Sequence, residues 1–162
     1  MRRIKIGLMA MALAAMTVPA SVSSAQESEA DAAASGPRVT INVQVDPGTG
    51  ALSPLGQFVI QTFPEEAPKH VESFVKRASS GYYTNTTFHR LVPGFIVQGG
   101  DPQSRTDWRS PRLGTGGNKI SIAPEPGVFP SRGSVVGARL PGKKASGSQF
   151  FICLADLPSL EG

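Results

Sequence analysis

Residues 88–101 constrain the fold of this chain more than any other stretch. Residues 88–92 mix aromatic, aliphatic and polar side chains, the chain breaks at Pro93-Gly94, and a second short run with Phe, Ile and Val follows. Short runs rich in aromatic and β-branched residues are typical of strands, and Pro-Gly is a turn signal. The stretch therefore predicts a β-hairpin, and it carries Arg90 and Gln98, whose side chains suit paired hydrogen bonding to a peptide.

Most other regular segments also favour strands. Residues 39–45 alternate Val and Ile with polar residues, and 57–63 follow after a Gly- and Pro-containing turn as the second arm of an antiparallel pair. Strand character returns at 134–140 and 149–154. The chain is therefore predicted to be mainly β.

One amphipathic helix is predicted to begin at Pro68, where a first helical turn tolerates proline, and to stop at Gly81. Its apolar residues recur at helical spacing and would cover a core. Its charged residues and His70 are predicted to form a solvated face; the charged residues are Lys69, Glu72, Lys76 and Arg77.

Residues 1–25 have the organisation of a secretory signal peptide. Arg2, Arg3 and Lys5 precede an apolar run, and small residues suitable for cleavage end at Ala25. The apolar run is shorter than the roughly 20 residues that cross a bilayer. We therefore expect export to the periplasm or beyond, with no stable membrane anchor after cleavage. Residues 26–37 are acidic, rich in alanine and without periodicity, as in a flexible linker.

Composition excludes several classes of function. Three of the 16 basic residues lie in the predicted leader, so the mature chain would carry 13 basic residues against 12 acidic ones, too balanced for a nucleic-acid footprint. Cys153 is the single cysteine, which excludes an internal disulfide. One cysteine and two histidines are too few ligands for a structural zinc site. We expect no metal and no cofactor.

Two glycine-rich segments imitate nucleotide-binding motifs. Residues 137–144 match a P-loop except at the last position, where the hydroxyl ligand of Mg²⁺ is missing, and Pro141 removes an N–H from the phosphate cradle. Residues 114–117 lack the remainder of a dinucleotide fingerprint. Neither segment predicts nucleotide binding. Trp108 lies among arginines, where stacking on a ligand is possible, but we favour a loop held by its own tryptophan.

Four motifs in order resemble the cyclophilins, a family of peptidyl-prolyl cis-trans isomerases, in a bacterial and exported form. They are Phe88-His89-Arg90 with Pro93-Gly94-Phe95, Gln98-Gly99-Gly100-Asp101, Gly114-Thr115-Gly116-Gly117, and Gly147-Ser148-Gln149-Phe150-Phe151-Ile152. The resemblance covers residues 38–162 and implies a closed antiparallel β-barrel of eight strands with two capping helices. The chain would end before the last strand segments and the second helix, so the domain is expected to be incomplete at its C-terminus.

The resemblance also implies the site. Arg90, Gln98 and Phe95 would be catalytic, with Arg90 acting on the reacting amide and Gln98 binding the substrate carbonyl. The substrate-binding residues would be Ile96, Gly114, Ala138, Arg139, Gln149, Phe151, Leu160 and His89. Arg139 and Ser159 stand where relatives commonly have asparagine and tryptophan.

Each assignment has a plainer alternative. Arg90 could be a surface arginine paired with Asp101 or Glu125, and His89 a structural residue. Phe95 and Phe151 could be core, as we expect for Phe88 and Phe150, and Cys153 is expected to be a buried spectator.

The resemblance implies an enzyme that accelerates X-Pro rotation in exported, folding polypeptides, acting as a monomer. The alternative is a non-catalytic module on the same fold that binds proline peptides. The residue types fit isomerisation independently of the resemblance. In the twisted amide the nitrogen regains a lone pair, to which a guanidinium can donate a hydrogen bond, and the rotation itself requires neither a nucleophile nor a base.

Overall fold

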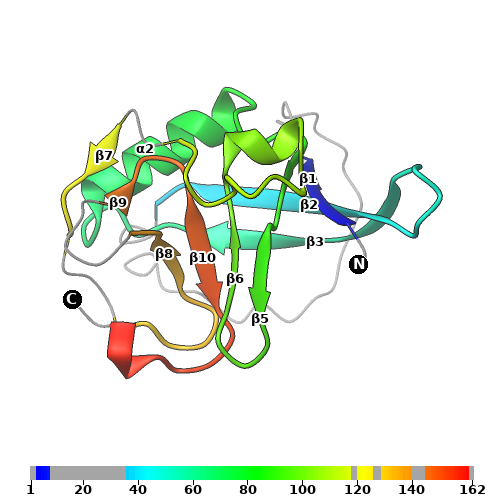
Figure 1. Ribbon diagram of the computed structural model, residues 1–162. Helices are drawn as coiled ribbons and strands as arrows, with labels where there is room; N and C mark the ends of the chain where they lie inside the picture. The colour runs from blue at the N-terminus through cyan, green and yellow to red at the C-terminus, as the bar shows by residue number, and fades with distance from the viewer. Residues whose placement is uncertain (1–2, 8–35, 118–119, 126–128, 140–144, 161–162) are drawn as a thin grey trace, which may run out of the picture.

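A computed structural model describes residues 3–7, 36–117, 120–125, 129–139 and 145–160 (Figure 1). The strands are β1 (Arg3–Gly7), β2 (Arg38–Asp46), β3 (Ser53–Gln61), β4 (Thr86–Thr87), β5 (Arg90–Val92), β6 (Ile96–Gly99), β7 (Ser121–Ile122), β8 (Val135–Gly137), β9 (Ala145–Ser146) and β10 (Phe150–Cys153). The helices are α2 (Pro68–Ser79) and the 3₁₀ turns η1 (Pro102–Arg105) and η2 (Pro158–Leu160). Apart from β1 and residues 36 and 37, the predicted leader and linker lie outside the described residues.

The described strands form three antiparallel sheets. Their orders are β3-β2-β1-β4, β5-β6-β10-β8 and β7-β9. The mainly β architecture with one α-helix confirms the fold expected from the sequence. The expected closure is not seen among the described strands, because no ladder joins β4 to β5: the chain leaves the strand conformation at Phe88-His89, between them.

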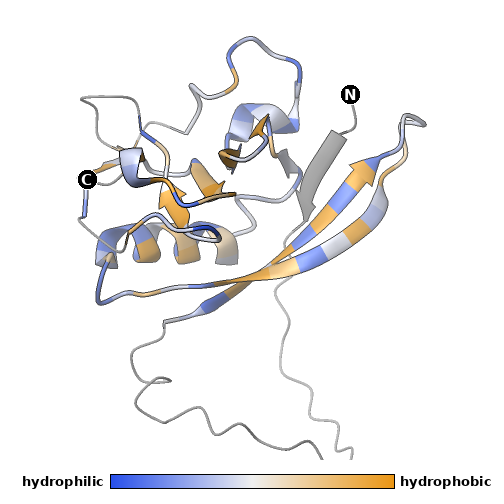
Figure 2. Ribbon diagram, turned by 90° about the horizontal axis from the view of Figure 1, so that it is seen from below, coloured by the Kyte–Doolittle hydropathy of each residue, from blue (hydrophilic) through white to orange (hydrophobic). Residues whose placement is uncertain are grey.

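Strands β2 and β3 form a long antiparallel ribbon (Figure 2). Val39 and Ile41 of β2 are buried, as the alternation in the sequence predicts. The ladder continues to Val45 opposite Ser53, so β3 begins four residues before the predicted start and ends two before the predicted end. A register shift between Val43 and Gln44 lets the partner strand extend past Gly56.

Helix α2 begins at Pro68, and Gly81 adopts a left-handed φ of 72° just after its end. Ala78 is buried, and Phe74 and Val75 pack against the main core. The predicted solvated face is only partly correct: Lys69, Glu72 and Lys76 are exposed, whereas His70 and Arg77 are half-buried. Within the described ranges, no helix has the length and apolar character needed to cross a membrane.

Two hydrophobic clusters hold the sheets together. The first joins the β2–β3 ribbon to α2 and β10, and its buried members are Val39, Ile41, Ile60, Ala78, Tyr83 and Phe150. The second is smaller and lies around β6 and the end of β10, with Ile96, Cys153 and Leu157 buried. Phe88 and Phe150 belong to the first cluster, and Cys153 is buried in the second, as expected from the sequence.

Candidate functional site

The β5-β6-β10 ladder brings three predicted site residues into one row. Arg90 on β5 lies opposite Gln98 on β6, and Gln98 lies opposite Phe151 on β10. Directly paired residues of an antiparallel sheet point to the same face. The arginine, the amide and the aromatic ring therefore share one face of this sheet, and we call these three residues the Arg90 row.

The side chain of Gln98 is held by a chain of hydrogen bonds. Its Nε2 donates to Oε1 of Gln149 at 3.0 Å. Nε2 of Gln149 donates in turn to the carbonyl of Gly116 at 2.7 Å and to the Asp101 carboxylate at 3.4 Å. Gln149 is only 3% exposed, so it positions Gln98 from behind instead of meeting a peptide itself. The other N–H of the Gln98 amide has no acceptor among the described residues and can serve a ligand.

Apolar residues border the row. Phe95, Phe151 and Leu160 are partly buried and pack against the second cluster, in which Ile96 is fully enclosed. The hairpin turn is tied to the end of β10, because the N–H of Leu154 donates to the carbonyl of Phe95 at 2.8 Å. Gly94 adopts a φ of 69° in this turn, which explains why the Pro-Gly pair is needed there. Phe95, Phe151 and Leu160 thus offer a dry surface beside Arg90 and Gln98.

The Ala138–Arg139 segment runs beside β10. The N–H of Ala138 donates to the carbonyl of Gln149 at 2.9 Å, and its carbonyl accepts from the N–H of Ser146 at 2.8 Å. The Ala138 N–H is therefore used inside the protein, not available to a bound peptide. Arg139 is exposed at the edge of the described segment.

Asp101 is the site residue whose importance the sequence reasoning missed. Its fully buried carboxylate accepts from the N–H groups of Gln103 at 2.8 Å, Gly114 at 2.7 Å and Gly116 at 3.1 Å, besides Gln149. Gly114 itself is exposed and held in place by this bond. An Asp followed by Pro102 at a helix start was the available signal, since Asp is a favoured N-cap and proline a favoured first residue.

The alternative in which Arg90 pairs with Asp101 or Glu125 is wrong. Asp101 is occupied by backbone and Gln149 donors, and Glu125 accepts from the N–H groups of Lys69 and His70, both at 3.0 Å. Glu125 also accepts from Nδ1 of His70 at 2.6 Å. Burial opposes ionisation of Glu125, but these hydrogen bonds outweigh it and lower the pKa of its carboxyl. Glu125 therefore caps α2, and Arg90 stays exposed on its strand.

His89 does not add a hydrogen-bonding group to the Arg90 row. Both ring nitrogens are buried and have no hydrogen-bond partner among the described residues. Burial lowers the pKa of this imidazole, with the Asp101 charge opposing the shift. A buried neutral imidazole fits the structural alternative better than substrate contact.

Two other expectations concern the rest of the surface. The Arg109 guanidinium lies 4.4 Å from the centroid of the Trp108 ring, so this ring packs within its own loop, as favoured above.

The described residues contain no group of three or more His, Cys, Asp or Glu that could hold a metal ion. Residues 140–144 of the P-loop-like segment lie outside the described residues.

The chain is similar to known proteins over residues 44–162. The profile of the cyclophilin type peptidyl-prolyl cis-trans isomerase/CLD family matches residues 44–162. A peptidyl-prolyl cis-trans isomerase of Helicobacter pylori is 38% identical over 110 residues, which cover 66% of this chain and 62% of that protein. A peptidyl-prolyl cis-trans isomerase of Synechococcus elongatus is 37% identical over 107 residues, which cover 66% of this chain and 68% of that protein. The chain thus spans less than two thirds of the Helicobacter relative.

A solved structure shares the fold. The cyclophilin type peptidyl-prolyl cis-trans isomerase of Cryptosporidium parvum, determined in the presence of the dipeptide Ala-Pro, superposes with a TM-score of 0.57 at 35% identity. The match covers 66% of this chain and 67% of the other.

Proposed function

The chain belongs to the cyclophilin-type peptidyl-prolyl cis-trans isomerase family, and we propose that it accelerates cis–trans rotation of X-Pro bonds in polypeptides. The observation that carries the proposal is the Arg90 row, in which a guanidinium, a held amide and an aromatic ring share one sheet face. Its proposed substrates are proline-containing chains, and support comes from the Cryptosporidium relative studied with Ala-Pro.

Each part of the row suits one part of a twisted prolyl amide. Rotation must overcome a barrier of about 18–20 kcal/mol that comes from amide resonance. When the bond twists, the proline nitrogen becomes a better hydrogen-bond acceptor, so the guanidinium of Arg90 binds the twisted form more strongly than the planar form. Only such a difference in binding accelerates the reaction.

Arg90 is not sufficient by itself. A charge-assisted hydrogen bond contributes about 1.5–3 kcal/mol, whereas a thousandfold acceleration needs about 4 kcal/mol. Gln98 supplies a second contact by donating to the carbonyl that precedes the proline, at an angle set by Gln149 and Asp101. The ring of Phe151 and the neighbouring Phe95 exclude water, and this favours the less polarised, twisted amide.

Substitution of Arg90 tests the proposal. We expect Arg90→Ala to lower kcat/KM for an Ala-Pro test peptide about ten- to a hundredfold, since one charge-assisted contact is lost. The matched control is Arg38→Ala, which removes an exposed strand arginine of the other sheet and should leave the rate unchanged. Equal rates for wild type and Arg90→Ala would reject the proposed mechanism. Peptide binding without any acceleration in wild type would instead indicate the non-catalytic module.

We also propose that the chain is made as an exported precursor and acts on folding polypeptides outside the cytoplasm as a monomer. The support is the basic and apolar organisation of residues 1–25. Cleavage after residue 25 would remove β1, so the exported form would lack the strand that pairs with β2 and β4 in this structure. Fractionation of cells expressing the whole chain, with N-terminal sequencing of the exported product, would test it. A product that retains Met1 in the cytoplasm would reject export, and a dimer mass in gel filtration would reject the monomer.

A further inference from the structure

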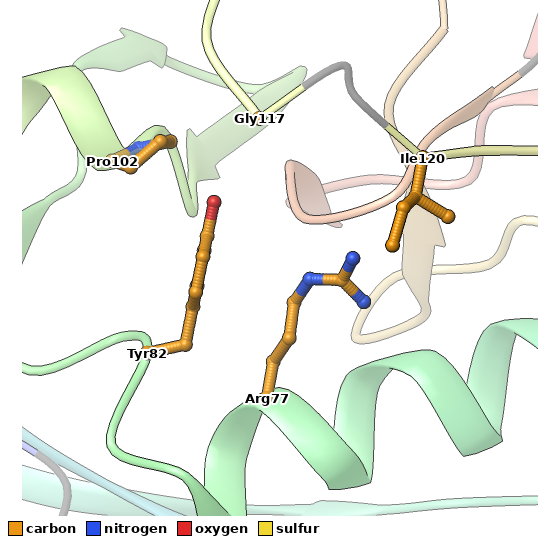
Figure 3. A pocket seen from close by; sticks show the side chains of 5 residues that line it. All are labelled: Arg77, Tyr82, Pro102, Gly117 and Ile120. Atoms are coloured by element: carbon orange, nitrogen blue, oxygen red, sulfur yellow. The ribbon is translucent and has the colours of Figure 1, made fainter.

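A cavity of about 320 Å³ lies outside the Arg90 row (Figure 3). Arg77 at the end of α2 and Tyr82 just after it form one side, and the loops near η1 and after Gly114 form the other. Its lining residues are Arg77, Tyr82, Pro102, Gly117 and Ile120. This volume is at the lower end of the roughly 300–1,000 Å³ typical of small-ligand sites.

The cavity holds an arginine with unused donors. Nη1 of Arg77 donates to the carbonyl oxygen of Ser73 at 3.1 Å and to its hydroxyl, which anchors the side chain to α2. The described residues provide no acceptor for Nε and Nη2, the opposite edge of the same guanidinium. Figure 3 shows this group between the Tyr82 ring and the Ile120 side chain. Two neighbouring N–H groups on one planar edge match the two oxygens of a carboxylate.

A second arginine, Arg105, contacts the same tyrosine ring as Arg77. The guanidinium carbons of Arg77 and Arg105 lie 5.5 Å and 4.9 Å from the centroid of the same Tyr82 ring. In the described part of the chain, neither arginine forms an ion pair with a carboxylate. Arg105 is exposed and does not line the cavity, so the positive charge at the cavity itself is that of Arg77, which attracts an anion.

The remaining walls are apolar, so the anion must carry an apolar body. The ring of Tyr82 and the pyrrolidine of Pro102 face the hollow, and Ile120 closes it on the other side (Figure 3). Arginine, aromatic and aliphatic groups in one cavity suit a single carboxylate on a hydrophobic residue better than a phosphate, which prefers several polar donors.

Behind Gly117 lies the buried hydroxyl group of Ser148. Gly117 has a φ of 76°, and a Cβ there would collide with the Ser148 hydroxyl, so only glycine fits. The Ser148 hydroxyl is buried and has no hydrogen-bond partner among the described residues. Unsatisfied buried hydroxyls are uncommon in folded proteins, and an ordered water is one group that can satisfy them; Ser148 itself does not line the cavity.

We propose that this cavity binds an organic carboxylate with an apolar body, with the carboxylate on the Nε–Nη2 edge of Arg77 and the body against Tyr82 and Pro102. The C-terminal residue of a polypeptide and a free aromatic acid share this chemistry. The site is separate from the Arg90 row and does not depend on isomerase activity.

Binding is tested with probes that contain no proline. Three probes are titrated into the isotope-labelled whole chain: acetyl-Ala-Ala-Phe with a free carboxylate, the same peptide as the C-terminal amide, and phenylacetate. We expect the free-acid peptide to shift the amide resonances of Tyr82 and Gly117 in a saturable manner, and the amide to bind at least about tenfold more weakly. Tighter binding of the peptide than of phenylacetate assigns the ligand to polypeptide termini, and the reverse order assigns it to free acids.

Two variants and their controls separate the charge from the fold. Arg77→Gln should weaken binding of the acid at least about tenfold, whereas Lys76→Gln, on the next, exposed position of α2, should not change it. Ile120 is 58% exposed, so Ile120→Asp adds a repelling charge at the cavity without disturbing a core. It should also abolish binding, and Val59→Asp, at a 56% exposed position of β3, should not.

Failure to bind either acid, or equal binding of acid and amide, would overturn the proposal. Loss of binding in Lys76→Gln or Val59→Asp to the same extent as in the cavity variants would do so too. The isomerase rate is measured in parallel with an Ala-Pro peptide. Whether or not the protein shows isomerase activity, the outcome of the binding test is unaffected.

Discussion

The two faces of the β5-β6-β10-β8 sheet contain the same kinds of residue but serve different purposes. Phe150 and Phe151 are neighbours on β10, so their side chains point to opposite faces. Phe150 is 4% exposed and meets the rings of Tyr83 at 5.7 Å and Phe74 at 5.5 Å in the main core. Phe151 is only partly buried and completes the Arg90 row. The comparison shows that the position along the strand, odd or even, and not the residue type, separates the core phenylalanine from the one on the proposed site face.

The largest expected effect is on the core face. Phe150→Ala should lower the free energy of unfolding by about 3–5 kcal/mol, because it removes a ring packed against two other rings and leaves a cavity. Urea denaturation followed by circular dichroism measures it. A loss below about 1 kcal/mol would mean that the first cluster does not depend on this face.

Asp101 supports the site face from inside the protein. Asp101→Asn places an NH₂ group where a carboxylate oxygen accepts N–H donors, and should cost about 2–3 kcal/mol. The matched control is Asp107→Asn, because Asp107 is exposed and accepts a single local N–H bond from Arg109. Equal unfolding midpoints for the two variants would show that the buried carboxylate is not needed to hold residues 114–116.

Phe151→Ala should show the reverse of Phe150→Ala. Since the ring is only partly buried, we expect a stability loss of about 1–2 kcal/mol, together with at least a tenfold fall in kcat/KM, equivalent to about 1.4 kcal/mol of transition-state binding. Stability and proline-peptide kinetics are measured on the same preparation. If this variant loses as much stability as Phe150→Ala and keeps its activity, the proposed division between the faces is wrong.

The smallest effect concerns the helix that covers the core face. Glu125→Gln should destabilise the protein by about 1 kcal/mol at pH 7, because a cap of α2 loses its charge, while the isomerase rate stays unchanged. The folded-state pKa of Glu125 lies below its usual value of 4.5, so its contribution is complete above that pH and is lost as the pH falls through the lowered pKa. Unfolding curves of the two proteins should therefore converge in acid, and a constant difference down to acid would contradict the assignment.

Much of this structure follows from local patterns. Alternation predicts β2, the Pro93-Gly94 turn signal predicts the 88–101 hairpin, and Pro68 with Gly81 predicts both ends of α2, because strand periodicity and turn residues act over a few positions. Motif order predicts which residues form the site. The start of β3 was missed because it depends on the pairing register with β2 across a bulge. The half-burial of His70 and Arg77 was missed because each depends on a partner distant in the chain: Glu125 for His70, and the loops around the Arg77 cavity for Arg77.

By itself, the sequence indicated six of the described strands (β2, β3, β5, β6, β8 and β10), the helix and the family, because period, turn chemistry and spaced motifs are properties of neighbouring residues. It did not indicate β1, which lies in the predicted leader, or the two-residue strands β4, β7 and β9. Only the tertiary structure decided that Arg90, Gln98 and Phe151 form a row, that Asp101 and Gln149 hold Gln98 from behind, and that Arg77 and Arg105 meet at one ring. These facts depend on register and on contacts between distant segments. A shift of one residue in the pairing would turn every side chain of a strand to the other face, and no local pattern records which pairing is chosen.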